Sequence, residues 1–128
     1  MSDRNGIQSQ VVDTSSGVGL GGNEFETGAV NVAANSTIKK GTVLKRDGEK
    51  FAPLTDSSTE TPVGVVPFDI ENKGSAAADM SLRAIIFGPV IADLLTIGGQ
   101  PITTAQRDLI RDHSGIIPIK ANDISHTK

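Results

Sequence analysis

The run TVLKRDGEKFAPL constrains the fold more than any other part of the sequence. It places Asp47 and Gly48 between two short β-prone stretches, and an Asp-Gly pair in that setting is the strongest local signal for a tight β-hairpin. A two-residue turn at this pair sets Leu44 opposite Phe51 on one face of the hairpin. Pro53 ends the ladder because proline has no N–H to donate. We therefore expect antiparallel β structure in this part of the chain.

The apolar residues that follow fall mainly in short β-prone stretches. TPVGVVPFDI predicts a strand, residues 81–87 predict a second, and GIIPI predicts a closing strand. The most apolar run, MSLRAIIFGPVIADLLTI, is interrupted by Gly88 and Pro89. We expect a break there, and a second β-like or short helical piece from Val90. This run is expected to form the centre of the core.

One helix is predicted near the C-terminus, in ITTAQRDLIRDHSG. Thr103 and Gln106 fit a capping box at its start, and Gly115 stands where a C-terminal cap belongs. Asp108 and Arg111, three residues apart, can pair on the exposed side. The apolar residues that share the other side are Ala105, Leu109 and Ile110.

Residues 1–36 differ in composition from the rest of the chain. They are mostly small and polar, with scattered apolar residues and no sustained period. This predicts a flexible Gly-rich N-terminal arm (1–36), a β-rich domain (37–121) and a polar C-terminal tail (122–128). A plain disordered tail is the alternative, because so few apolar residues cannot offset the cost of ordering the backbone. Val30 and Val32, two residues apart, favour a strand that is added to another sheet.

The stretch GVGLGG, from Gly17 to Gly22, matches G-x-G-x-x-G, the phosphate-binding fingerprint of dinucleotide-binding folds. That fingerprint works only where a buried strand leads into the glycines and a helix N-terminus follows them. QSQVVDTSS precedes the stretch and NEFETGAVNV follows it, and neither has the required pattern. We interpret the glycines as a source of conformational freedom. An enzyme or cofactor binder built around them is the least favoured class of function.

Composition argues against several other functions. The formal net charge is −3 and the chain has no Cys, which argues against binding to nucleic acid or an anionic membrane and rules out disulfides and thiolate metal sites. No apolar run reaches the roughly 20 residues that a membrane span needs. His113 is explained as a helix-end residue and His126 as a tail residue. Asp108 and Asp112 are best explained as a solvated helix face, so we expect no catalytic residue, no cofactor and no metal.

Taken in order, five segments of the chain resemble the head decoration proteins of tailed bacteriophages, the lambda head protein D family. The segments are IKKGTVLKRDGEKFAPL, TPVGVVPFDI, SLRAIIFGPVIADLL, ITTAQRDLIRDHSG and GIIPI. The resemblance covers residues 38–119, and the Gly-rich arm is longer than the family pattern leads us to expect. The fold expected is mainly β (α+β): a small β-sandwich or β-tulip-like barrel with one short C-terminal helix and an extended N-terminal arm.

The resemblance implies a structural function without catalysis. Proteins of this family bind as homotrimers at the three-fold and quasi-three-fold positions of the expanded head and cement it against the pressure of packaged DNA. The implied partner is the major capsid protein, with no nucleic acid, membrane or small-molecule substrate. The implied location is the exterior of the virion, which is assembled in the host cytoplasm. The alternative is another virion or tail module with a small β domain and an assembly arm.

In either case we expect the arm to bind its partner mainly through backbone hydrogen bonds, because it has few large side chains. The side chains expected to anchor it are Val18, Leu20, Phe25, Val30 and Val32.

Overall fold

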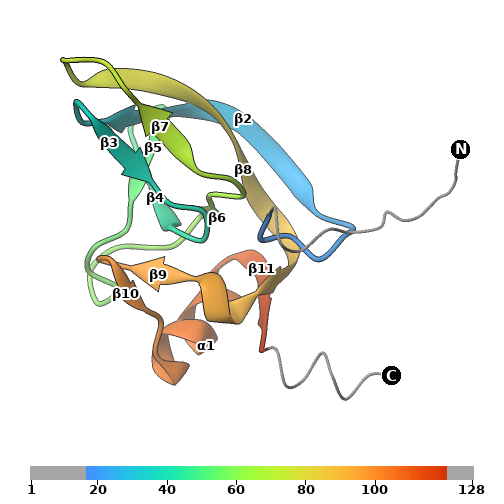
Figure 1. The fold of residues 1–128 in the computed structure, drawn as a ribbon. Helices are drawn as coiled ribbons and strands as arrows, with labels where there is room; N and C mark the ends of the chain where they lie inside the picture. Colours follow the sequence, from blue (N-terminus) through green and yellow to red (C-terminus); the bar gives the residue numbers. More distant parts are fainter. Residues whose placement is uncertain (1–16, 121–128) are drawn as a thin grey trace, which may run out of the picture.

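A closed barrel of five strands forms the body of the protein (Figure 1). The computed structural model describes residues 17–120. The barrel strands are β2 (Glu24–Val32), β4 (Val43–Asp47), β5 (Lys50–Pro53), β6 (Gly64–Val65) and β8 (Ala78–Ile91). Their order around the barrel is β8, β2, β5, β4 and β6, and β6 returns to β8 through the pair Val65 and Ile85. The predicted mainly β fold is confirmed.

Shorter elements surround the barrel. They are β3 (Ser36–Ile38), β7 (Ile70–Asn72), the 3-10 helix η1 (Ala92–Leu94), β9 (Thr96–Ile97), β10 (Gln100–Pro101), α1 (Thr104–His113) and β11 (Gly115–Ile119). β11 pairs in parallel with the last part of β8, and α1 packs against β11. β3 pairs with β7, and β9 pairs with β10, so each pair forms a small separate sheet. The single short C-terminal helix was predicted and is confirmed.

The barrel wall is buried on both of its sides. Adjacent residues of a strand point to opposite sides, yet the wall contains adjacent residues that are both fully buried: Val43 with Leu44, Val65 with Val66, and Ala84 with Ile85. One member of each pair belongs to an interior core, together with Val30, Val32, Phe51 and Leu82. The other belongs to an outer core, together with Val18, Leu54, Val90, Leu95, Ile97, Ile110 and Ile116.

The first described strand corrects the predicted domain boundary. β2 lies between β8 and β5, and Val30 and Val32 are buried in the interior core. Their alternation indicates a strand, but the strand belongs to this chain's own barrel. Gly28 makes its position possible, because a Cβ there would lie 2.7 Å from the Phe51 ring. The predicted arm is therefore wrong from Gly17 onwards, and residues 1–16 and the predicted tail lie outside the described residues.

The predicted hairpin is confirmed, but its register is shifted. Phe51 pairs with Arg46, not with Leu44 as predicted, and the two turn residues are Gly48 and Glu49. Gly48 has a φ of 64°, a conformation that glycine adopts without strain at the first position of a type II′ turn. The turn therefore starts one residue later than the Asp-Gly pair suggests.

β8 runs without interruption through Gly88 and Pro89, so the predicted break is wrong. Gly88 accommodates the local geometry with a φ of 105°. Pro89 remains part of the sheet: it is paired with Ile117 of β11, and its carbonyl accepts a hydrogen bond from the Leu20 N–H at 3.0 Å. The short helical piece expected from Val90 follows as η1.

α1 begins at the predicted capping box. Thr103 Oγ1 accepts the Gln106 N–H at 3.1 Å, and Gln106 Oε1 accepts the Thr103 N–H at 2.9 Å. The end of the helix differs from the prediction, because Ser114 caps it: its hydroxyl donates to the Ile110 carbonyl at 2.6 Å. Gly115 is instead the first residue of β11.

The predicted faces of α1 are partly correct. Ile110 is fully buried and Leu109 half-buried, but Ala105 is exposed. The predicted pair of Asp108 and Arg111 forms at 3.6 Å. At ten residues α1 is the longest helix in the described part of the chain, and no helix there could cross a membrane.

Candidate functional site

Titratable side chains are scattered over the described surface. Across residues 17–120, no three His, Asp or Glu side chains come close enough together to hold a metal ion. His113 and Asp112 are exposed at the end of α1, and Asp108 pairs with Arg111. His126 lies outside the described residues.

The backbone of the GVGLGG stretch forms hydrogen bonds with the end of β8. The Ile91 N–H donates to the Val18 carbonyl at 3.0 Å, and the Leu20 N–H donates to the Pro89 carbonyl at 3.0 Å. The Gly21 N–H donates to a side-chain oxygen two residues ahead. A phosphate-binding loop needs its amides free and a helix after them, whereas here the amides of Leu20 and Gly21 are engaged and β2 follows. The stretch fastens the N-terminal side of the barrel to the end of β8.

The five residues predicted to anchor a binding arm lie in different environments. Val18 belongs to the outer core, and Val30 and Val32 to the interior core, so none of the three can contact a partner while the barrel is intact. Leu20 is half-buried. Phe25 is 41% exposed and is available at the surface. The arm mechanism is wrong for the three valines, because their side chains fill this chain's own cores.

The paired ends of β8 and β11 carry an exposed apolar surface, which we call the ribbon face. Its opposite side is buried through Val90 and Ile116. On the ribbon face, Phe87 is 48% exposed and Ile117 is 43% exposed. Cross-strand pairs make it continuous from end to end, and all of its members are apolar or glycine: Phe87 with Gly115, Pro89 with Ile117, and Ile91 with Ile119.

Sequence reasoning missed the ribbon face, although its signal is present. The sequence predicts GIIPI as a closing strand without assigning its two faces, and in the structure Ile116 and Pro118 are buried while Ile117 is exposed. A strand that is apolar on both faces needs cover on both faces. α1 packs against β11 on the side of Ile116, and on the other side Ile117 stays 43% exposed.

A second surface feature, which we call the groove, lies on the outside of the barrel. It has a volume of about 290 Å³. Its lining includes Phe25 of β2, the segment with Pro67, Phe68 and Ile70, and Arg83 of β8. Phe68 is 56% exposed, the highest value among the large apolar side chains described. The groove is therefore largely apolar, with one cation, Arg83, and one anion, Asp69, in its lining.

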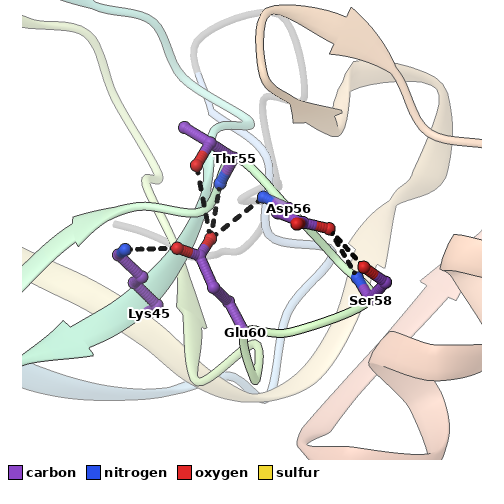
Figure 2. A network of polar contacts seen from close by, with 5 residues as sticks. All are labelled: Lys45, Thr55, Asp56, Ser58 and Glu60. Carbon is purple, nitrogen blue, oxygen red and sulfur yellow. Dashed lines mark hydrogen bonds and ion pairs between the residues drawn. The ribbon is translucent and has the colours of Figure 1, made fainter.

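Glu60 organises the loop between β5 and β6 (Figure 2). Lys45 Nζ donates to its Oε2, and the N–H groups of Thr55 and Asp56 donate to its Oε1 at 2.9 and 3.0 Å. Asp56 in turn accepts bonds from the N–H and hydroxyl of Ser58. The hydrogen bond from Lys45, followed by those from the two backbone amides, lowers the pKa of Glu60 to about 2. Every polar group of this network has a partner within it, so we assign it a structural role.

The barrel interior is filled near the β4–β5 hairpin. The Phe51 ring is almost fully buried, and the Arg46 guanidinium lies 4.7 Å from its centroid. Glu26 pairs with Arg46 at 2.6 Å, and this bond lowers the pKa of Glu26. Small barrels of this size are normally filled by side chains, and at this end the Phe51 ring fills the interior.

Comparison with known proteins gives no relative for this geometry: no protein-family model, curated protein or solved structure matches the chain.

Proposed function

We propose that this protein is a cement protein of a tailed-bacteriophage head, which binds the expanded shell as trimers and stabilises it without catalysis. The observation that carries the proposal is the ribbon face. A continuous apolar sheet face with half-exposed Phe87 and Ile117 is typical of a protein–protein contact. The resemblance of residues 38–119 to the lambda head protein D family suggests the major capsid protein as the partner.

Burial moves the proposed contact away from the three valines predicted for it. Val18, Val30 and Val32 hold the two cores together, so a partner cannot bind them without unfolding the barrel. The ribbon face needs no such change, because Phe87 and Ile117 are already at the surface. We therefore place the main contact with the shell, or with neighbouring subunits of the trimer, on this face.

Stabilisation follows from selective binding. A protein that binds the expanded shell and not the unexpanded one lowers the free energy of the expanded state alone. Three subunits acting together turn the second and third contacts into intramolecular events, which raises the overall affinity by about 10² to 10⁴ where the geometry permits. A small exposed face on each subunit is sufficient under those conditions.

Co-sedimentation tests the proposal. The protein is incubated with expanded, DNA-free heads and with unexpanded proheads, both from the producing phage lacking this gene. We expect saturable binding to the expanded heads only. Folded protein that binds neither shell overturns the proposal and points instead to a tail or another virion partner.

Two matched variants locate the contact. Ile117→Lys places a charge on the ribbon face, and we expect it to weaken binding to expanded heads about tenfold or more, as removal of a central apolar contact does. Ala105→Lys adds the same charge at an exposed position of α1 and should leave binding within about twofold of the original. Equal effects of the two substitutions would exclude the ribbon face as the contact.

A further inference from the structure

The groove holds a cation that has no carboxylate partner among residues 17–120. The Arg83 guanidinium lies 4.7 Å from the centroid of the Phe25 ring, and it forms no ion pair with any residue from 17 to 120. Asp69 also lines the groove, but its Oδ1 accepts the Lys40 backbone N–H at 2.8 Å. An exposed arginine held over an aromatic ring keeps its donors available for an incoming carboxylate.

The same groove borders residues 79–84 of β8, where the edge that faces away from β2 forms no strand ladder. β8 pairs with β2 along one edge, and its other edge pairs with β6 at Ile85 and with β11 from Phe87 to Ile91. β7 also approaches β8, but its ladder is formed with β3. Outside its strand ladders, β8 makes no backbone–backbone hydrogen bond between residues 79 and 84. Such an edge can accept an extended segment as an additional strand.

We propose that the groove is an acceptor site for an extended segment of another protein that carries a carboxylate beside an apolar side chain. The segment pairs with β8 alongside Ser81 and Arg83, and its carboxylate meets the Arg83 guanidinium. Its apolar side chain enters between Phe25 and Phe68. Backbone hydrogen bonds supply affinity that is independent of sequence. The cation supplies selectivity, because a segment without an acid leaves it unpaired.

This site is independent of the proposed function. The groove and the ribbon face share no residue. The groove can bind an extended segment whether or not the ribbon face binds a viral shell. Its test therefore uses purified protein and peptides, so that failure here and failure of shell binding are separate results.

The test is a titration of the full chain followed through its backbone amide signals by NMR. The probe is a short blocked peptide of alternating valine and threonine with one central aspartate. We expect saturable shifts at Ser81, Leu82 and Arg83, with a dissociation constant of about 1 mM or tighter. The same peptide with asparagine at its centre should bind about three- to tenfold more weakly. The peptide methylated on alternate amides should not bind, because it cannot form the ladder.

Two substitutions separate the cation from general electrostatics. In the Arg83→Gln variant, the aspartate and asparagine peptides should bind equally. Arg111→Gln, which removes an arginine from the exposed side of α1, should preserve the difference between them. Absence of saturable shifts, shifts centred on Phe87 and Ile117, or an aspartate preference that survives Arg83→Gln each overturn the proposal.

Two further outcomes would identify a different occupant and would also overturn it. If the substitutions Val11→Ser and Val12→Ser in the full chain move the signals of Ser81 and Arg83 before any peptide is added, the chain's own N-terminal residues occupy the groove. If those signals move with protein concentration alone, a second copy of the chain occupies it.

Discussion

The two faces of the β8–β11 ribbon are equally apolar in sequence, but their environments are opposite. On the covered face, Val90 and Ile116 are fully buried, with Ile110 of α1 in the same cluster. On the ribbon face, Phe87 and Ile117 keep nearly half of their surface exposed. The difference comes from α1, which packs on one side only. Apolar alternation therefore marks a surface that needs cover, but it does not say whether this chain or a partner supplies the cover.

Truncation of one isoleucine on each face should give the largest contrast. Ile116→Ala leaves a cavity in the outer core and should lower the free energy of unfolding by about 2–5 kcal/mol. Ile117→Ala removes a half-exposed side chain and should cost about 1 kcal/mol or less. Urea denaturation of both variants measures the difference. Equal losses would mean that the ribbon face is buried in the isolated protein.

A methyl group at Gly115 should crowd Phe87, its cross-strand neighbour on the ribbon face. A Cβ there would lie 2.8 Å from Phe87 Cδ1 and 3.0 Å from the Ile86 carbonyl oxygen. We expect Gly115→Ala to lower the free energy of unfolding by about 1–3 kcal/mol through this overpacking. Phe87→Ala should remove part of that loss, and a double-mutant cycle measures the coupling. Strictly additive effects would contradict the contact.

Loss of the helix cap should weaken the cover of the buried face. Thr103→Ala removes the side-chain acceptor of the Gln106 N–H and should lower the free energy of unfolding by about 1 kcal/mol. Thr104→Ala, one residue later, is the matched control, because its side chain makes no capping bond. Thermal unfolding compares the two, and a larger loss for Thr104→Ala would show that the cap does not hold α1 in place.

The smallest effect should come from pH, through the loop attached to α1. Ser57 Oγ accepts a hydrogen bond from Gln106 Nε2 at 3.2 Å, and Glu60 organises the same loop. Because the pKa of Glu60 is lowered from 4.5 to about 2, its ionised form stabilises the fold fully above pH 4.5. This contribution disappears as the pH falls through 2.

Glu60→Gln should therefore lower Tm slightly near neutral pH. The difference in Tm between this variant and the unmodified protein should shrink to nothing as the pH falls from 4.5 to 2. Glu49→Gln, in the exposed hairpin turn, serves as the control for loss of one negative charge. A gap for Glu60→Gln that stays constant over this range would show that the carboxylate charge has no role in the loop.

Local signals predicted the parts of the fold that depend on a few neighbouring residues. Thr103 and Gln106 lie within one helical turn, so their capping box was visible in sequence and is present in the structure. The hairpin was visible for the same reason. Its register was not, because the turn could start at Asp47 or at Gly48, and only the pairing of Asp47 with Lys50 in the folded barrel settles the choice.

Features that depend on distant pairing were not predictable. The alternation of Val30 and Val32 indicates a strand but does not show which sheet receives it. The contact of Arg83 with Phe25 arises from the register that sets Thr27 opposite Arg83, and a single sequence does not reveal that register. The ribbon face was hidden because half-exposed and buried apolar residues look alike in sequence.

The place of β2 in the barrel has a consequence for how the chain folds. β2 is the first strand described, yet its antiparallel partner, β8, begins only at Ala78. The barrel cannot close until both ends of this long connection meet, and such non-local pairing slows folding to about milliseconds to seconds. During synthesis, β2 cannot pair with β8 until β8 has left the ribosome. Until then Val30 and Val32 remain exposed to water, and the nascent chain is open to misassembly.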